Sequence, residues 1–268
     1  MSELVFLKLG GSLITDKRRF ETPRPAVITR LAKEIAEALH AKPDLRLVLG
    51  HGSGSYGHFV AQKYRIQEGN LQDWLGYAET SSAAQRLNRL VTDSLLAEGV
   101  PVVSLQPSAS ARCTNGELIS MAEDPVAALL ERGLVPLVYG DIALDTIKGC
   151  TIVSTEQLFV HLAQSLRPQR ILMVGEVSGV FSGDPQRDSI VRLIPDINSR
   201  NYAEIEHMLS SSFGVDVTGG MLGKVRTLWK LIVDQPNLSV RIITGRRNRL
   251  VMEALLSSDL QEGTLLHY

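Results

Sequence analysis

Length, composition and charge exclude several classes of protein. The chain has 268 residues, of which 44% are hydrophobic and 21% charged, as in ordinary soluble globular proteins. Its formal net charge of −1 gives no overall basic field for nucleic acid or an anionic membrane, and no apolar run is long enough to span a bilayer. The two cysteines, Cys113 and Cys150, support neither a disulfide framework nor a zinc cluster. We therefore expect a cytoplasmic protein with free thiols and no nucleic-acid or membrane partner.

In the first half of the chain, strand-like apolar runs alternate with stretches of helical periodicity. Strands are predicted at 3–9, 45–50, 100–105 and 134–139, and helices at 25–39, 74–96 and 124–131. Pro25 suits a first helical turn, and Asp124 is expected to cap the last of these helices. The strand at 134–139 is expected to continue through residues 140–145 into a turn or hairpin.

The same alternation continues in the second half. Helices are predicted at 155–166, 201–211, 219–233 and 248–257, strands at 169–175 and 239–245, and a final edge strand at 262–268. No internal repeat, low-complexity tract or charged linker divides the chain. The sequence therefore predicts one α/β domain over residues 1–268, with an open, mostly parallel central sheet sandwiched by helices.

Residues 50–58 read GHGSGSYGH and directly follow a predicted strand. Small residues let backbone N–H groups turn toward an anion, and a helix starting near Tyr56 would add its N-terminal dipole. The residues of this nest are Gly52, Ser53, Gly54 and Gly57. His58 at its end could donate a hydrogen bond to the same anion, so we predict a phosphate site here. Alternatively His58 is satisfied by backbone carbonyls, and for His51 a structural role is as consistent as a functional one.

The same loop contains the spacing G-x-G-x-x-G, which is typical of dinucleotide-binding proteins. That motif requires a second strand that ends in an acidic residue about 20 residues later. Residues 67–90 are instead polar and then helical. An NAD-binding oxidoreductase is therefore the less favoured interpretation.

Two further glycine clusters include lysines. The first comprises Lys8, Gly10, Gly11, Ser12 and, in the next turn, Lys17; the second comprises Gly219, Gly220 and Lys224. The second lacks the first glycine and the Ser or Thr of a P-loop. A lone lysine is most often a solvated surface charge, but three glycine nests, two of them with an embedded lysine, are typical of a site for several phosphates. We expect this site at the carboxyl ends of the strands, the usual ligand edge of an open α/β sheet.

Two more segments are candidates for the same edge. Gly140 and Asp141 follow the strand at 134–139, where the carboxylate could hold lysines in position near the phosphates, whereas Asp145 is expected to cap a turn. Residues 179–185 read GVFSGDP, a turn by composition that includes Gly179 and Asp184. This turn is either a surface hairpin or, in the context of a phosphate site, a loop for the nucleotide base.

Five segments, taken in chain order, resemble the motifs of the amino acid kinase superfamily. They are KLGGS, the loop at 50–58, YGDIALD, GVFSGDP and DVTGGMLGKV. They extend over nearly the whole chain. Within that superfamily, HGSGSYGH with its terminal His58 is similar to the loop of the isopentenyl phosphate kinases, which use ATP to convert isopentenyl phosphate to isopentenyl diphosphate. The resemblance implies the same αβα sandwich, a homodimer, and approximate lobes at 1–175 for the acceptor and at 176–268 for the nucleotide.

The resemblance also implies which residues act. The expected catalytic residues are Lys8, Lys17, His58, Asp141 and Lys224. The expected acceptor-binding residues are Gly52, Ser53, Gly54, Gly57, His58 and Gly140. The expected ATP-binding residues are Lys8, Gly10, Gly11, Ser12, Gly179, Asp184, Gly219, Gly220 and Lys224. The lysines would contact the transferring phosphates, and His58 with the loop amides would hold the acceptor phosphate.

The chemistry of the expected reaction agrees with these residue types. A phosphate monoester has a second pKa near about 6, so its attacking oxygen is already anionic at neutral pH and needs no general base. The difficulty is to bring two anions together, which requires positioning and charge neutralisation. Three lysines, glycine amides, His58 and Mg²⁺ carried with ATP would supply both. Because Mg²⁺ binds mainly through substrate phosphates, no cluster of metal ligands is required.

The chain departs from the family pattern at two places. Many members have a glycine where this chain has Ser53, but serine is small and still offers its amide. Many members read SGDD where residues 154–157 read STEQ, with Thr155 and Glu156 as polar groups on the nucleotide side.

Other functions remain open alternatives. A fosfomycin kinase is the nearest, because a phosphonate would also fit an anion nest that ends in a histidine. A kinase that forms an acylphosphate from an amino acid would need carboxylates for the ammonium group, and no clear cluster is present. An inactive, ligand-sensing homologue is a further alternative, which the presence of Lys8, Lys17, Asp141 and Lys224 disfavours.

Overall fold

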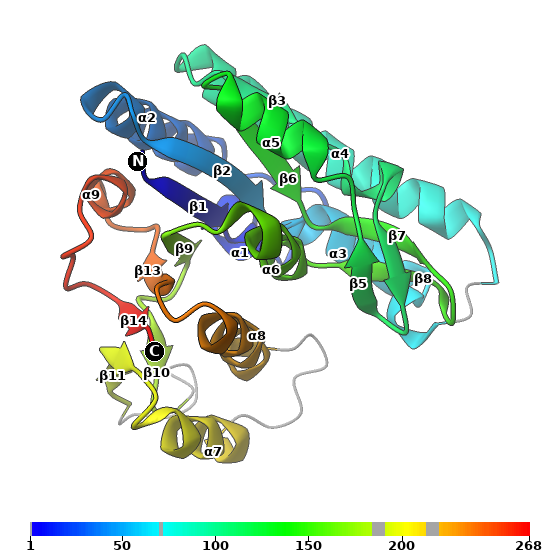
Figure 1. Ribbon diagram of the computed structural model, residues 1–268. Helices are drawn as coiled ribbons and strands as arrows, with labels where there is room; N and C mark the ends of the chain where they lie inside the picture. Colours follow the sequence, from blue (N-terminus) through cyan, green and yellow to red (C-terminus); the bar gives the residue numbers. More distant parts are fainter. Residues whose placement is uncertain (1, 70–71, 184–190, 213–219) are drawn as a thin grey trace.

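The computed structural model describes residues 2–69, 72–183, 191–212 and 220–268. An eight-stranded sheet forms its centre (Figure 1). Its strands are β1 (Leu4–Leu9), β2 (Arg46–His51), β3 (Val102–Ser104), β6 (Val135–Tyr139), β9 (Arg170–Gly175), β12 (Asp196–Ile197), β13 (Ser239–Thr244) and β14 (Thr264–Leu266). Their order across the sheet is β12-β14-β13-β9-β1-β2-β6-β3. Every neighbouring pair is parallel except β13 and β14, so the carboxyl ends of the central strands meet at one edge.

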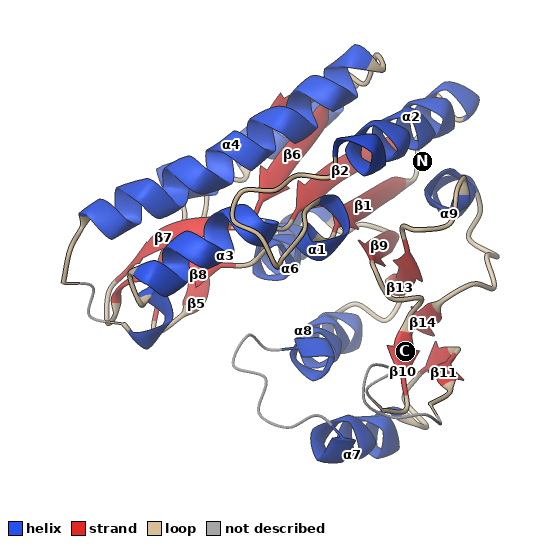
Figure 2. Cartoon of the chain, turned by 180° about the vertical axis from the view of Figure 1, so that it is seen from behind, coloured by secondary structure: helices blue, strands red, loops and turns tan. Residues whose placement is uncertain are grey.

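Helices cover both faces of this sheet. They are α1 (Gly11–Ile14), α2 (Pro25–Ala41), α3 (Gly54–Lys63), α4 (Leu75–Ala97), α5 (Asp124–Glu131), α6 (Thr155–Leu166), α7 (Tyr202–Ser212), α8 (Gly220–Asp234) and α9 (Leu250–Leu256). The helices α2, α3, α4 and α9 pack on one face (Figure 2), and α5, α6, α7 and α8 pack on the other. The predicted α/β sandwich with a mostly parallel central sheet is therefore confirmed.

Strand β1 shows how the sequence places its side chains between these two layers. Val5, Leu7 and Leu9 belong to the core that includes α2, α4 and α9, whereas Leu4 and Phe6 belong to the core on the opposite face. Since side chains alternate along a strand, Lys8 shares the face of Leu4 and Phe6 and points toward α6 and α8.

Two smaller sheets lie beside the central one. The first contains β4 (Arg112–Thr114), β5 (Glu117–Ser120), β7 (Asp141–Asp145) and β8 (Gly149–Val153) in the order β5-β4-β7-β8. The second pairs β10 (Val180–Phe181) with β11 (Leu193–Ile194). Two 3-10 helices, η1 (Ile66–Glu68) and η2 (Pro107–Ala109), contact the four-stranded sheet. This sheet also packs against α4, so β7 and α4 enclose space at the end of β6.

Two local predictions are wrong. Asp124 is the first residue of α5 rather than its cap; the cap position is Glu123, and no side chain caps the helix there. The strand predicted at the edge of the sheet, β14, lies between β12 and β13, and β12 forms the edge. The edge position could not be predicted because β12 has only two residues, too few to show any periodicity.

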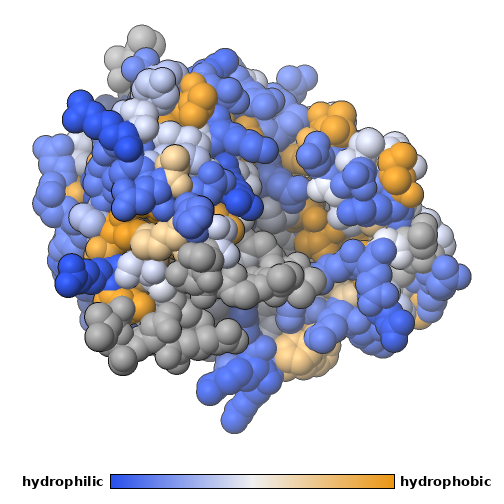
Figure 3. Space-filling model, turned by 90° about the horizontal axis from the view of Figure 1, so that it is seen from below, coloured by the Kyte–Doolittle hydropathy of each residue, from blue (hydrophilic) through white to orange (hydrophobic). Residues whose placement is uncertain are grey.

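None of the helices in the described part of the chain combines the length and apolar character needed to cross a membrane. On the face seen in Figure 3, hydrophobic residues form small groups among hydrophilic ones. The exposed apolar side chains of the chain include Leu90 and Leu96 on α4, which are 43% and 47% exposed.

Candidate active site

Two glycine turns meet at the carboxyl ends of β1 and β2. The amide N–H of Gly52, after β2, donates to the carbonyl of Leu9 over 3.0 Å. A Cβ atom at Gly11 would lie 2.5 Å from the amide nitrogen of Gly54, and a Cβ atom at Gly52 would lie 2.9 Å from that of Gly11. Gly54 also has a φ of 53°, which disfavours any side chain. The glycines are therefore required for the two turns to approach each other.

This approach brings several backbone N–H donors together at the ends of β1 and β2. The N–H groups of Gly11, Ser12, Ser53 and Gly54 have no hydrogen-bond acceptor among the residues that the structure describes. Ser55 N–H is instead taken by Thr15 Oγ1 at 2.9 Å, and Thr15 in turn donates to the carbonyl of Gly11. Unpaired amides in adjacent turns have the arrangement of an anion-binding nest, and binding of a phosphate there stays a prediction.

Lys8 lies beneath this nest and forms a buried ion pair. Its side chain is 9% exposed, as is that of Glu156, and Nζ of Lys8 contacts Oε1 of Glu156. Lys17 and Lys224 are both exposed and lie close enough to act on this pair. The charges of Lys17 and Lys224 thus act on Lys8, whose carboxylate partner, Glu156, was not among the predicted site residues.

The pKa values of the pair reflect these neighbours. Burial lowers the pKa of Lys8 below its usual value; Glu156 opposes this, and the positive charges of Lys224 and Lys17 add to it. Burial acts to raise the pKa of Glu156, but the charges of Lys8 and Lys224 outweigh it, so that pKa lies below its usual value. An additional anion beside the three lysines would favour their charged forms.

Glu156 reaches this position because α6 begins at the sheet edge with a capping box. Ser154 Oγ accepts from the amide of Gln157 at 3.2 Å, and Gln157 Oε1 accepts from the amide of Ser154 at 2.9 Å. Thr155 Oγ1 donates to the carbonyl of His51 over 2.7 Å, which ties α6 to the end of β2. The STEQ segment, which departs from the SGDD pattern, therefore supplies the partner of Lys8.

His51 is fully buried and part of a polar network. Its Nδ1 lies 3.1 Å from the carbonyl of Gly52, and its Nε2 lies 3.1 Å from Nδ2 of Asn88, whose Oδ1 accepts from Ser104. Since a carbonyl can only accept, Nδ1 carries the proton and Nε2 accepts from Asn88. Because the Gly52 carbonyl is held by His51, the Ser53 N–H of the same trans peptide points the opposite way. His51 thus fixes an amide of the nest, and its role is structural.

Burial lowers the pKa of His51 to about 4, even though the Gly52 carbonyl opposes this shift. The unfolded chain binds this proton near pH 6.5, so the contribution to stability is complete above that pH and is lost as the pH falls toward 4. We predict that the wild-type protein loses about 2 kcal/mol more stability than a His51→Gln variant between about pH 7 and about pH 5. Urea unfolding at both pH values measures the difference, and equal losses would contradict the assignment.

A pocket of about 80 Å³ opens beside the nest between α3, α4 and the four-stranded sheet. It is lined by Ser53, Gly57, His58, Ala61, Gln67, Thr80, Ala84, Gly140, Asp141 and Ile152. His58 is exposed on α3, and the buried hydroxyl of Thr80 has no hydrogen-bond partner among the described residues. The pocket therefore has polar groups near the nest and apolar ones, such as Ala61 and Ile152, along its walls.

Asp141 lies in this pocket but does not contact Lys8, whose carboxylate partner is Glu156. It accepts from the amides of Ser108 at 3.0 Å and Ile142 at 2.8 Å. Burial raises the pKa of Asp141, and these hydrogen bonds oppose the rise. We expected Asp141 to position the lysines. For Lys8, the carboxylate in that position is Glu156 instead. Asp145 caps the turn between β7 and β8, as predicted.

Among the remaining predicted residues, the structure describes Gly10, Gly179 and Gly220. Gly10 closes β1 against the carbonyl of Val174 at 2.7 Å, and Gly220 begins α8, which carries Lys224. Gly179 is buried, and a Cβ atom there would lie 2.5 Å from Oγ1 of Thr264 on β14. Its surroundings are thus those of a packed hairpin. Asp184 and Gly219 lie outside the described residues.

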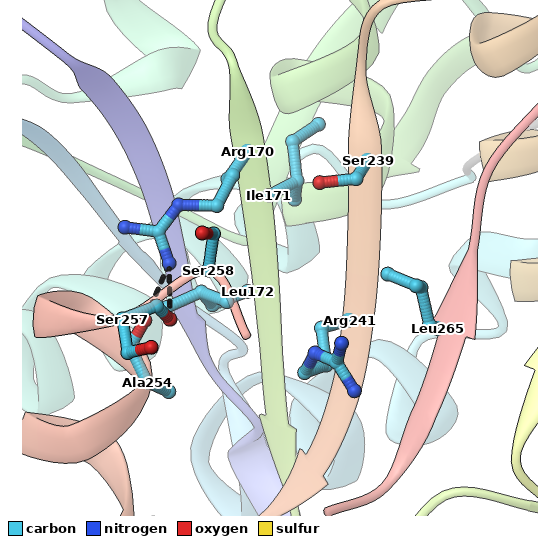
Figure 4. Close-up of a pocket in the computed structure, with 9 residues that line it drawn as sticks. All are labelled: Arg170, Ile171, Leu172, Ser239, Arg241, Ala254, Ser257, Ser258 and Leu265. Carbon is cyan, nitrogen blue, oxygen red and sulfur yellow. Dashed lines mark hydrogen bonds between the residues drawn. The ribbon is translucent and has the colours of Figure 1, made fainter. Parts of the chain in front are cut away.

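Two other cavities lie at the opposite edge of the sheet. The one in Figure 4 has a volume of about 10 Å³, room for one water, and Arg170 beside it donates to the carbonyls of Ala254 and Ser257. A groove of about 610 Å³ includes Arg46 and Val135, at the amino ends of β2 and β6. Although this groove is larger, the glycine nest and the lysines are at the carboxyl ends. The candidate active site is therefore the one at the carboxyl ends of the strands.

The sequence patterns missed Glu156, Thr80 and the His51–Asn88 pair. A signal existed for Glu156, because Ser154 and Gln157 have the spacing of a capping box, which places Glu156 in the first turn of a helix. Thr80 gave no signal, since a threonine on an amphipathic helix is ordinary until a pocket is found beside it.

Comparisons with known proteins agree with this geometry. The family model described as "Amino acid kinase family" matches residues 3–244. An isopentenyl phosphate kinase of Methanothermobacter thermautotrophicus is 34% identical over 96% of this chain and 97% of its own length. One of Haloferax volcanii is 36% identical over 85% of this chain and 88% of its own. A solved isopentenyl phosphate kinase structure superposes with a TM-score of 0.83 and 32% identity, covering 98% of this chain and all of that one. The chain is thus a member of the amino acid kinase family and, within it, of the isopentenyl phosphate kinases.

Proposed function

We propose that this protein transfers the γ-phosphoryl group of ATP to isopentenyl phosphate, giving isopentenyl diphosphate and ADP. The observation that carries the proposal is the position of the pocket. It places His58 and Gly57 beside the unpaired amides of Ser53 and Gly54, at the edge where Lys8 is buried. An acceptor phosphate in this nest would have its small apolar tail between Ala61 and Ile152.

In this proposal the protein contributes charge and position rather than a base. The acceptor oxygen is already anionic at neutral pH, so no proton must be removed before attack. Lys8, Lys17 and Lys224 would offset the charge that accumulates between donor and acceptor, and the fixed amides would align them. A mechanism without a general base agrees with the surroundings of Asp141, because its carboxylate already accepts hydrogen bonds from two backbone amides.

ATP would be the donor, with Mg²⁺ on its phosphates. The described residues contain no group of three or more His, Cys, Asp or Glu side chains that could hold a metal ion by themselves. Glu156 is already paired with Lys8. We therefore expect the ion to be held by phosphate oxygens and water, where it would neutralise charge on the transferring group.

Residues 1–175 would bind the acceptor and residues 176–268 the nucleotide, with the transfer at the junction of β1, β2 and α8. A cytoplasmic homodimer is the proposed assembly. The exposed Leu90 and Leu96 on α4 are compatible with a partner, and light scattering would measure the oligomeric state.

The test is a coupled ADP-release assay with Mg-ATP in which isopentenyl phosphate and fosfomycin are offered separately. We expect turnover with isopentenyl phosphate alone. Turnover with fosfomycin alone would keep the lysine roles and assign the acceptor nest to a phosphonate. ATP binding without turnover on either acceptor would instead favour a ligand-sensing homologue.

A further inference from the structure

The loop between α1 and α2 carries Lys17 and has an unusual backbone. Thr15 and Pro23 form an isolated antiparallel bridge, and the amide of Asp16 donates to the carbonyl of Thr22 over 2.9 Å. Glu21, within this loop, has a φ of 43°, a left-handed conformation that disfavours a residue with a long side chain. Strain of this kind persists only where surrounding contacts impose it.

Three contacts hold the loop against α3 and α4. The amide of Thr22 donates to Oγ of Ser55 at 3.1 Å, and the ring of Phe20 meets the ring of Phe59 edge-on at 5.9 Å. The carboxylate of Glu21 accepts from Nε of Arg86 on α4 at 3.2 Å and also contacts Nη2. In Figure 2 the connection from α1 to α2 passes in front of the sheet, beside α3.

Arg86 is itself held in place. Its Nη1 donates to Oγ of Ser82, one turn earlier on α4, over 2.9 Å. Burial raises the pKa of Tyr56 on α3, and the charge of Glu21 raises it further while that of Arg86 opposes the rise. The ion pair therefore lies close to α3, the helix that carries His58.

We infer that Glu21 and Arg86 are positioning residues that hold the Lys17 loop at the phosphates. The inference rests on the proposed role of Lys17 in phosphoryl transfer. Lys17 is exposed, so burial does not fix it, yet its charge reaches the buried Lys8. A rigid loop tied to α4 would keep that charge at a constant place. Because Arg86 lies on α4, the same ion pair ties the loop to the helix whose Thr80 and Ala84 line the acceptor pocket.

The global stability of the fold would gain little from this pair. The side chains of Arg86 and Glu21 are 49% and 23% exposed, and ion pairs of this kind contribute little. Their effect should therefore be visible in the rate. A misplacement of about 1 Å can lower the rate about a hundredfold. The loss of an exposed ion pair, in contrast, changes the folding equilibrium only about a few-fold.

The test is a double-mutant cycle between Glu21→Gln and Lys17→Ala. Glutamine keeps the size of the side chain and removes its charge, so we expect kcat to fall roughly tenfold, with the acceptor KM changed less than about twofold. In the Lys17→Ala background, Glu21→Gln should have no further effect, because the group that it positions is gone. An equal fall in both backgrounds would overturn the inference.

The same helix offers a matched control. Arg89 and Asp93 form an exposed ion pair on α4 with side chains 67% and 53% exposed, and this pair is local to the helix. Asp93→Asn should leave kcat unchanged. The exchange Glu21→Arg with Arg86→Glu restores an ion pair of opposite sense and should recover most of the lost rate.

A second readout separates this inference from the proposed function. The rate at which an amine-reactive ester labels Lys17, followed by mass spectrometry, reports the freedom of the loop without any turnover. We expect Glu21→Gln to increase this rate several-fold and Asp93→Asn to leave it unchanged. If isopentenyl phosphate is not phosphorylated, the proposed function fails while the labelling still decides the inference. Unchanged labelling in Glu21→Gln would overturn it.

Discussion

Replacing His58 by alanine is expected to lower kcat by roughly a hundredfold to a thousandfold while ATP binding is preserved. The magnitude is that of removing one donor from a site where charge develops in the transition state. His58 lines the proposed acceptor pocket beside Ser53 and Gly57, so its loss should leave the acceptor phosphate incompletely held. Because His58 is exposed, the substitution should leave the core intact.

Two measurements decide this expectation. Steady-state rates give kcat and the acceptor KM, and a titration with a nonhydrolysable ATP analogue gives the nucleotide affinity. His58→Gln keeps a hydrogen-bond donor and should retain part of the activity. His40→Ala removes an exposed histidine at the far end of α2 and serves as the control. A collapse of nucleotide affinity in His58→Ala would instead place His58 in the nucleotide site or in the fold.

Much of the fold could be predicted because its signals are local. The apolar runs of β1, β2, β6, β9 and β13 are bounded by glycine or polar turns, and the helices between them have regular spacing. The strands β4, β5 and β8 could not be predicted, since each has three to five residues and polar neighbours. Strands β4 and β8 pair with β7, and β5 pairs with β4, so their place is a property of the tertiary structure.

The site could be predicted in part for the same reason. Glycine nests and their lysines are adjacent in sequence, so residues such as Lys8, Gly11 and Gly52 are visible without a structure. Glu156 is 148 positions beyond Lys8 and meets it only after β1 and α6 reach the same edge. The carboxylate nearest to a predicted lysine therefore depends on strand order, and Asp141 was the more conspicuous candidate because it directly follows a strand.

Glu156→Gln is expected to destabilise the protein by about 3–5 kcal/mol, the usual cost of removing one partner from a buried ion pair. Lys8 would keep its buried position without its counter-ion, beside the charges of Lys224 and Lys17. Its pKa should fall further, and the alkaline limb of the activity profile should move to lower pH if charged Lys8 is required. Urea unfolding and the pH dependence of kcat/KM measure these two effects. Glu79→Gln, which breaks an exposed pair with Lys63, should cost less than about 1 kcal/mol.

A double substitution separates the structural role of this pair from its chemical one. Lys8→Met with Glu156→Leu replaces both charges by apolar groups of similar size, which is often neutral for stability. We expect the double variant to recover most of the stability lost in Glu156→Gln and none of the activity, because the phosphates would lack their buried cation. Recovery of both would mean that Lys8 only balances Glu156. Recovery of neither would mean that α6 depends on the charge of Glu156 for its place at the sheet edge, and the pair would then be a feature of the fold.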